Sequence, residues 1–298
     1  MSYKRSRGYA VFLIPGVLAF LLIVIVPFAA NIGISFTKWK GVGTPEWIGF
    51  DNYEKAFHDE LFWASFQNNM QLLIAMTVIP TILGLLLAVF LYDNITHHFG
   101  QRATSVFRAG FYLPQIMPLV VAAIVWRWIY QPNWGILNWL LDAVGLEQYQ
   151  RNWLGDGDLA LKSIMGMMVW FQLGYPLVIF MAALQRVDPQ LYEAASIDGA
   201  SWIQKVTRIT VPLIRPEIYV VILTTAIHAM KVFAPIYVMS RGTRRATIVA
   251  ARFSYKNFFE VPQVGYGATI ATLLTSIIIL LTAVFMFIQT RQERRENQ

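Results

Sequence analysis

Residues 187–212 read VDPQLYEAASIDGASWIQKVTRITVP and form a polar, potentially helical segment between two strongly apolar ones. Asp188 suits the N-cap of a helix that begins at Pro189, because the first helical position tolerates proline. Gly199 suits the end of that helix, since glycine readily adopts the left-handed backbone of a helix terminus. The segment therefore predicts a helix followed by a tight turn.

The residues after the turn predict a second, short helix. Ser201 suits its N-cap, and its apolar side chains recur at helical spacing: Trp202, Ile203, Val206 and Ile209. In the first helix, Ala194 and Ala195 share a face with Leu191 and leave a flat strip that another protein can approach closely. A helix-turn-helix between apolar segments is typical of a docking element, and we call residues 187–212 the docking segment.

The composition indicates a membrane protein. Of the 298 residues, 56% are hydrophobic and only 14% are charged, whereas soluble domains are about a quarter charged. The absence of cysteine excludes a disulfide framework, thiol catalysis and a cysteine-ligated metal. The net charge is +7, but the basic residues lie mostly in loops and tails. This pattern indicates membrane topology rather than nucleic-acid binding.

Hydropathy predicts six transmembrane helices in one all-α domain over residues 1–298, since a span needs about 20 apolar residues. The candidate spans are residues 9–34, 69–91, 108–130, 161–184, 212–238 and 268–288. A secretory signal peptide is the alternative for the first, but the apolar core of a signal peptide is only about 7–15 residues long. We therefore expect an uncleaved first span.

The basic residues predict the orientation. Lys4, Arg5 and Arg7 precede the first span, and positive charge at this position favours a cytoplasmic N-terminus. Six spans return the chain to the same side, so we expect a multi-pass protein of the cell (cytoplasmic or inner) membrane with both termini in the cytoplasm. The docking segment, which follows the fourth span, is then cytoplasmic too.

The docking segment resembles the EAA loop of ABC importer permeases. The family pattern is E-A-A-x3-G-x9-I-x-L-P, and here Glu193, Gly199, Ile209 and Pro212 fall at the matching places, with Val211 in place of leucine. The resemblance implies the type I permease fold and a docking site for an ATPase. The residues expected to couple to that ATPase are Tyr192, Glu193, Ala194, Ala195, Asp198, Gly199, Ile209 and Pro212.

Other motifs extend the resemblance over the whole chain. Residues 47–53 (WIGFDNY) resemble the W-x-G-x-x-N-Y element in the first outer loop of carbohydrate-type permeases. Residues 135–138, 233–239 and 265–268 resemble the family's G-x-x-N, F-D-x-I-Y-V-L and G-Y-G elements. Residues 240–245 (SRGTRR) depart from the usual T-x-G-G-P, so the outer loop here is basic. The resemblance implies a carbohydrate as solute, delivered by an extracytoplasmic binding protein, and a second homologous permease subunit.

Polar and aromatic residues inside the spans are candidates for the solute pathway, because polar groups are costly against lipid. By resemblance to maltose-type permeases, the candidates are Trp170, Leu173, Gly174, Leu177, Thr225 and Ala229. Chemistry alone adds Gln172, Tyr175 and His228, which offer hydrogen bonds or a flat ring for stacking on a sugar. Packing between helices is the alternative role for each of them.

Several functions find no support in the sequence. No G-x-x-x-x-G-K-[ST] loop occurs, so ATP and Mg²⁺ are expected on a separate ATPase dimer, and no cofactor is expected in this chain. His97-His98 lacks a third ligand at helical spacing, so no metal site is expected. A stand-alone secondary transporter or channel is the alternative function, but internal repeats and intramembrane acidic residues are lacking, Glu217 being the one candidate.

Overall fold

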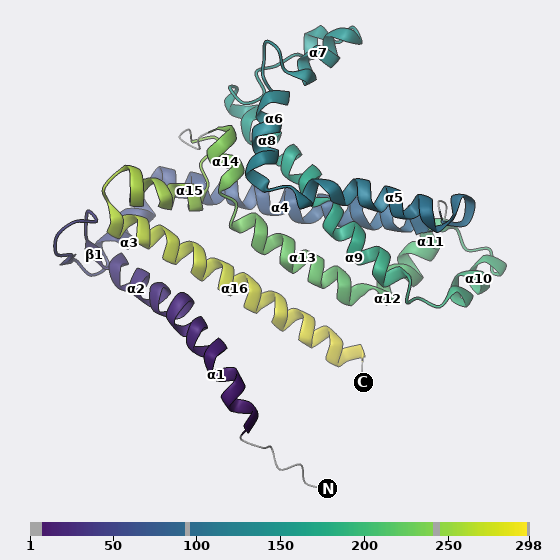
Figure 1. Ribbon diagram of the computed structural model, residues 1–298, viewed down its shortest axis with the longest axis horizontal. Coiled ribbons are helices and arrows are strands. Elements are labelled where there is room, and N and C mark those ends of the chain that lie inside the picture. Colours follow the sequence, from purple (N-terminus) through teal and green to yellow (C-terminus); the bar gives the residue numbers. More distant parts are fainter. Residues whose placement is uncertain (1–7, 93–95, 241–244, 297–298) are drawn as a thin grey trace. The chain divides into compact units, whose positions relative to one another are not determined.

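The computed structural model describes residues 8–92, 96–240 and 245–296 (Figure 1). Within these ranges the chain is helical apart from one short ribbon of two strands. Two compact units arise, Met1–Phe62 with Phe253–Ser276 and Trp63–Arg252 with Ile277–Gln298. The single domain expected over residues 1–298 stays a prediction. The basic residues before residue 8, and Arg241 and Arg244 of the basic loop, lie outside the described residues.

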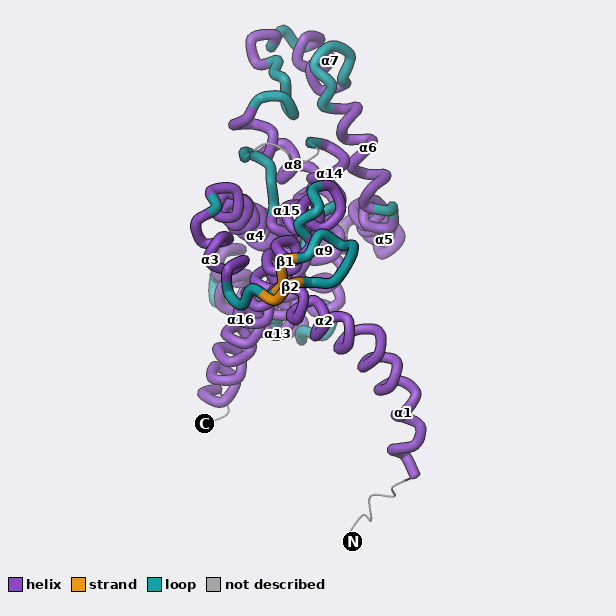
Figure 2. The backbone as a smooth tube through the Cα atoms, turned by 90° about the vertical axis from the view of Figure 1, so that its left-hand side faces the viewer, coloured by secondary structure: helices purple, strands orange, loops and turns teal. Residues whose placement is uncertain are grey.

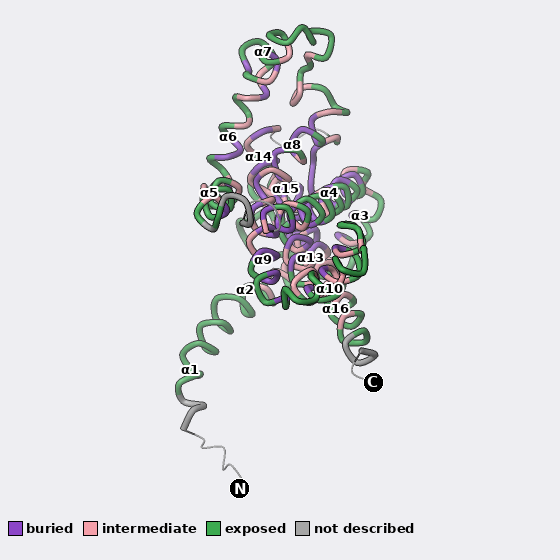
Figure 3. Tube along the Cα trace, turned by 90° about the vertical axis from the view of Figure 1, so that its right-hand side faces the viewer, coloured by how far each residue is buried: buried purple, intermediate pink, exposed green. Residues whose placement is uncertain are grey.

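The first unit begins with a long apolar helix. Helix α1 (Gly8–Phe20) continues through a π-helical turn (Leu21–Ile25) into α2 (Val26–Ser35). No residue of the apolar window in Phe12–Ser35 is buried within the structure, and Figure 3 shows this part of α1 as exposed. An uncovered apolar helix of this length suits contact with lipid, in agreement with the predicted first span.

A compact turn structure closes the first unit after α2. Strands β1 (Thr37–Lys38) and β2 (Glu46–Trp47) pair antiparallel, with Thr37 opposite Trp47 (Figure 2), and α3 (Asp51–His58) follows. The amide of Asn52 donates to the carbonyls of Ser35 and Thr37, both at 2.9 Å. The asparagine of the W-x-G-x-x-N-Y element thus ties α3 to the end of the first span.

The other residues of that element also have structural roles. The ring of Trp47 stacks on Phe36, with 5.5 Å between the ring centroids. Gly49 has φ of +61°, which favours glycine, and the Tyr53 hydroxyl lies 2.6 Å from the Ser35 hydroxyl. These contacts give Trp47, Gly49 and Tyr53 structural roles in this chain.

Helix α16 (Val264–Glu296) begins in the first unit and packs closely against α2 and β1. Thr269 donates to the Ser35 carbonyl at 3.0 Å, and Asn31 donates to Thr272 at 3.0 Å. A side chain at Gly265 would collide with the Thr37 carbonyl. The G-Y-G element therefore marks a place where two backbones approach too closely for a Cβ atom.

The second unit is a bundle of helices with two apolar cores. Its main elements are α4 (Glu60–Phe90), α5 (Thr96–Ile116), α6 (Leu119–Ile129), α7 (Ile136–Ala143), α8 (Gly157–Gln172), α9 (Gly174–Leu184), α13 (Arg215–Met230) and α14 (Ala234–Met239). The first residues of α4 and the last residues of α15 (Ala250–Tyr255) belong to the first unit. One core gathers Met76, Met167 and Ile236. The other gathers Phe180 and Leu184 with further residues of α4, α9 and α13.

Four helices in the described ranges are long and apolar enough to cross a membrane: Phe12–Ser35, Glu60–Phe90, Gly157–Leu184 and Val264–Gln292. Two bent pairs bring the number to six. Arg102–Ile116 and Leu119–Ile129 meet at 96°, and Trp202–Leu213 and Arg215–Met230 meet at 77°. The six spans of the predicted fold are therefore present only if each bent pair counts as one span.

Two predicted spans differ from the structure in their continuity. The span predicted over residues 108–130 breaks before α6, where Pro118 is the N-cap, because proline lacks a donor and keeps the preceding residue out of the helical region. Of the span predicted over residues 212–238, α13 forms the longer arm of the second bent pair, and α14 is a separate short helix with a proline in its first turn.

Candidate functional site

The docking segment begins with a well-capped helix, α10 (Pro189–Ile197). The Asp188 carboxylate accepts from the backbone N–H of Gln190 at 3.0 Å, so Asp188 caps the helix as predicted. Gly199 has φ of +74°. The N–H of Ala200 donates to the Ala195 carbonyl at 2.9 Å, which closes the C-terminus around a left-handed residue.

A second helix, α11 (Trp202–Lys205), follows the turn. The N–H of Ser201 donates to the Gln204 side chain at 2.7 Å, and the N–H of Gln204 donates to the Ser201 hydroxyl at 3.4 Å. This reciprocal capping box fixes the start of α11. A π-helical turn (Val206–Thr210) and α12 (Val211–Leu213) then lead to α13 (Figure 1). The predicted helix-turn-helix is confirmed.

Side-chain hydrogen bonds hold the two helices together. The Tyr192 hydroxyl lies 2.9 Å from that of Thr210, and Thr210 is only 1% exposed. Lys205 donates to the Ser196 hydroxyl at 2.7 Å. The first bond joins α10 directly to the turn that precedes α12, so the two halves of the docking segment are linked as one body.

The inner side of the docking segment is part of an apolar core. Val187, Val206 and Ile214 are buried in the same cluster as Phe180 and Leu184 of α9. Arg186 and Glu217 form an ion pair that joins the end of α9 to the start of α13. The docking segment, α9 and α13 therefore share one packed core, and packed cores resist deformation.

The outer side of the docking segment is exposed and partly apolar. Ile197 is 87% exposed, and Leu191, Trp202 and Ile203 are exposed as well. Ala194 and Glu193 are exposed between them, and Ala195 is half-buried. Exposed apolar side chains grouped on one element are typical of an interaction surface.

The remaining residues of the predicted coupling set lie at both edges of this surface. Asp198, Gly199 and Pro212 are exposed and Ile209 is half-buried. No heavy atom lies within 4 Å of the place where a Cβ of Gly199 would be. The requirement for glycine at this position is therefore its backbone conformation, not space for a neighbouring group.

The candidates for the solute pathway fall into two groups. Leu177, Thr225 and Ala229 are completely buried in the second unit, and the Thr225 hydroxyl donates to the Val221 carbonyl of its own helix at 2.8 Å. Their positions correspond to helix packing in this single chain. His228 is exposed and Tyr175 is half-buried against the core around Phe180.

Trp170 and Leu173 lie on an open surface cavity of about 450 Å³. The other lining residues come from α5 and are apolar: Val106, Phe107, Gly110, Phe111 and Pro114. A Cβ atom at Gly174 would lie 2.5 Å from the Phe111 carbonyl oxygen and 2.7 Å from the Tyr112 Cα. Gly174 therefore permits the close crossing of α5 and α9 that forms one side of this cavity.

Gln172 is the buried polar group in this region. It is only 3% exposed, and its Nε2 atom has no hydrogen-bond partner in the described chain. The hydroxyls of Thr77 and Thr81 on α4 are also buried without a partner. Leaving such groups unsatisfied costs about 1–3 kcal/mol each, so they are candidates for hydrogen bonds to water or solute. The i, i+4 spacing of the threonines within an apolar span was the sequence signal that could have identified them.

The described residues contain no group of three His, Cys, Asp or Glu side chains that could hold a metal ion. The side chains of the His97-His98 pair lie outside those that the structure describes.

Comparison with known proteins gives consistent matches over nearly the whole chain. Residues 81–298 match the profile of the family described as "Binding-protein-dependent transport system inner membrane component". The probable ABC transporter permease protein YurN of Bacillus subtilis is 35% identical, over 95% of this chain and 96% of YurN. The diacetylchitobiose uptake system permease protein NgcF of Streptomyces coelicolor is 29% identical, over 97% of this chain and 84% of NgcF.

The fold has a solved counterpart. A chain of a bacterial ABC transporter involved in the import of the acidic polysaccharide alginate superimposes with a TM-score of 0.82 at 23% identity, and the match covers 97% of this chain and 96% of that chain.

Proposed function

Since this chain belongs to the family of inner membrane components of binding-protein-dependent transport systems and is a permease subunit of an ABC importer, we propose that the docking segment is its cytoplasmic contact with a separate ATPase, and that its solute is a carbohydrate. Both termini then lie in the cytoplasm. The ATP and Mg²⁺ that drive transport bind to an ATPase dimer, and a second homologous permease completes the membrane part.

The observation that carries the docking role is the contrast between the two sides of α10. Its outer side presents Glu193, Ala194 and the exposed Ile197, while its inner side is held by the Tyr192–Thr210 hydrogen bond and by the core around Phe180. A helix with an exposed outer surface and a firmly packed inner side suits an element that transmits motion from a partner. When the ATPase subunits close on ATP, α10 moves with the groove that holds it, and α9 and α13 follow.

The assignment of a carbohydrate rests on chemistry and on relatives. NgcF is named for the uptake of diacetylchitobiose, a sugar. Trp170, on the surface cavity, offers an aromatic face, and the buried amide of Gln172 offers a donor with no partner. Aromatic faces and amides are the groups that bind sugar rings and hydroxyls. The apolar face of α5 beside Trp170 is open and provides a surface for the second permease.

The experiment that tests the docking role places a large side chain on the flat strip. Ala194→Tyr, expressed with the ATPase and the partner permease, is expected to insert into the membrane normally and to lose most of the ATPase subunit on purification. Ala143→Tyr, at an exposed alanine at the end of α7, is the matched control. Normal recovery of the ATPase with Ala194→Tyr contradicts the proposal, and so does uptake by this chain alone in liposomes.

A further inference from the structure

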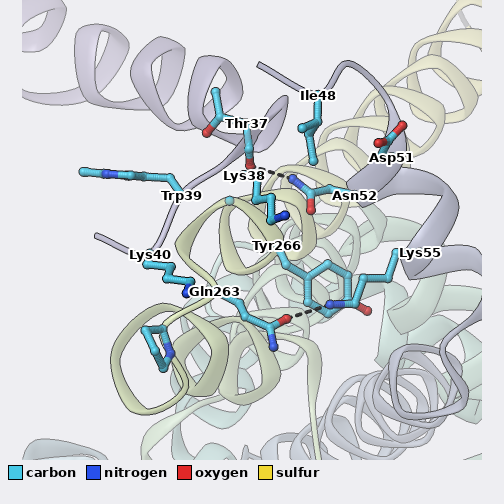
Figure 4. Close-up of a pocket in the computed structure, with 12 residues that line it drawn as sticks. Thr37, Lys38, Trp39, Lys40, Ile48, Asp51, Asn52, Lys55, Gln263 and Tyr266 are labelled. Carbon is cyan, nitrogen blue, oxygen red and sulfur yellow. Dashed lines mark hydrogen bonds between the residues drawn. The ribbon is translucent and has the colours of Figure 1, made fainter. Parts of the chain in front are cut away.

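A second pocket lies within the first unit, in the turn structure after α2 and beside the start of α16 (Figure 4). Its volume is about 380 Å³, and all its lining residues lie between positions 37 and 55 or between 262 and 266. The hydrogen bond from Asn52 to Thr37 and the close approach of Gly265 to Thr37 fix its walls. The pocket is thus built by the two sequence elements that tie the first span to the last.

The charge of this pocket is positive. Lys38, Lys40 and Lys55 line it, with Asp51 as the one acidic residue of the lining. Within the part of the chain that the structure describes, none of the three lysines forms an ion pair. Asp51 begins α3, where a carboxylate already interacts favourably with the helix N-terminus. The lysines therefore carry an excess of positive charge into one concave site.

Neutral groups hold Lys55 in place without cancelling its charge. Its ammonium donates to the Gln263 side chain at 2.6 Å and lies 4.2 Å from the centroid of the Tyr266 ring, as Figure 4 shows. The Tyr266 hydroxyl in turn donates to Asp59 at 2.7 Å. The Asp59 carboxylate is thus hydrogen-bonded to the tyrosine and not to Lys55. An ammonium fixed in this way is prepared for an anionic partner.

In the predicted order of six spans, the pocket and the docking segment belong to opposite sides of the membrane. The second, third and fourth spans lie between the turn structure and residues 187–212, and only the fifth lies between those residues and the start of α16. Each count is odd. With the docking segment in the cytoplasm, which rests on the proposed function, the pocket opens outside the cell.

We propose that this pocket receives an acidic side chain of an extracytoplasmic protein partner, the binding protein of this transport system. A binding protein must dock and leave in every cycle, and opposed charges accelerate such transient encounters. The pocket takes no lining residue from α8, α9 or α13, which carry the candidates for the solute pathway. The exposed rings of Trp47 and Phe50 in the same turn structure add the aromatic surface that protein interfaces favour.

The test uses the full chain in nanodiscs of uncharged phosphatidylcholine, with fluorescein-labelled hexaglutamate as the probe. Lys38→Gln/Lys55→Gln removes two of the three charges, and Lys40→Gln leaves the contacts of Lys55 intact. Lys162→Gln is the control, because Lys162 is exposed at the start of α8 and lies outside the pocket. We expect about tenfold weaker binding for the double variant, about threefold for Lys40→Gln and no change for the control, with all differences reduced at high salt.

Three outcomes overturn the inference. An equal loss of binding in Lys40→Gln and in the control Lys162→Gln means that the probe responds only to the net charge of the chain. Displacement of the probe by glucuronate at lower concentration than by glutamate assigns the pocket to an acidic sugar. Displacement of the probe by soluble glycerol phosphate at lower concentration than by glutamate assigns it to a lipid headgroup.

Cysteine labelling from outside the cell shows whether a negative result contradicts the role of the pocket or the orientation in the proposed function. Because the chain has no cysteine, Lys40→Cys introduces a unique thiol, which a membrane-impermeant maleimide is expected to label on spheroplasts. The absence of labelling from outside overturns the orientation and the pocket together. Labelling from outside with equal probe binding overturns the pocket alone.

Discussion

The hydrogen bond between Tyr192 and Thr210 joins α10 to the turn before α12, and Tyr192→Phe removes it while keeping the ring. A neutral hydrogen bond contributes about 1 kcal/mol net. Thr210 retains a longer bond to the Lys205 carbonyl at 3.5 Å, so its buried hydroxyl keeps an acceptor and no larger penalty is added. A loss of about 1 kcal/mol changes the ratio of attached to detached α10 by about fivefold.

The expected consequence is a loss of coupling rather than of assembly. The outer surface of α10 is unchanged in Tyr192→Phe, so the ATPase is expected to copurify normally. In the reconstituted importer, we expect the amount of solute transported per ATP hydrolysed to fall by up to about fivefold. Tyr149→Phe removes the same atom from an exposed tyrosine and is expected to behave like the wild type.

A double-mutant cycle with Thr210→Val tests whether the two hydroxyls act as a pair. The double variant is expected to be no worse than either single variant. An unchanged ratio of transport to hydrolysis in Tyr192→Phe refutes the role of this bond, and so does an equal loss in Tyr149→Phe.

Two further predictions concern the second unit. Gly174→Ala forces a Cβ atom to within 2.5–2.7 Å of the backbone of Phe111 and Tyr112, so it is expected to lower the free energy of unfolding by about 1–3 kcal/mol, measured by thermal unfolding in detergent. Gly16→Ala, where the Cβ meets nothing within 4 Å, serves as the control, and equal stability of the two variants counts against the packing. Gln172→Leu removes an unpaired buried amide, so stability is expected to be unchanged or raised while uptake falls; full uptake removes Gln172 from the pathway.

Local signals in the sequence predicted local structure well. The caps at Asp188 and Ser201 and the left-handed turn at Gly199 depend on residues only a few positions apart, and the structure contains all three. The motif around Asn52 was recognised by resemblance, but its physical basis, the two carbonyls that Asn52 binds, became visible only in the structure.

The continuity of the spans could not be predicted from proline positions alone. Pro80 lies inside the continuous α4, whereas Pro118 marks the break before α6. A proline leaves one backbone carbonyl of the helix without its hydrogen bond, and neighbouring helices determine whether that carbonyl is satisfied within the membrane. The positions of neighbouring helices cannot be read from the residues around the proline. Helix α4 also begins at Glu60, before the predicted start of the span at residue 69. The apolar stretch marks only the part of a helix that crosses the membrane, and the helix itself can extend beyond it.

The candidates for the solute pathway show the same limit. Resemblance gave Thr225 and chemistry gave His228 as candidates in the fifth span, but the structure buries the first and exposes the second. Which face of a span is covered depends on the neighbours of that span, and the proposed second permease would cover surfaces that are open in this single chain. Only the chemical type of these residues was available from the sequence.

The side of the membrane on which the docking segment lies is the most direct test of the proposed mechanism. Ile197→Cys places a unique thiol at a residue that is 87% exposed. We predict that a membrane-impermeant maleimide labels it only after the cells are made permeable, and that it forms a cross-link to the ATPase subunit in the assembled importer. Labelling of Ile197→Cys from outside intact cells would contradict the mechanism.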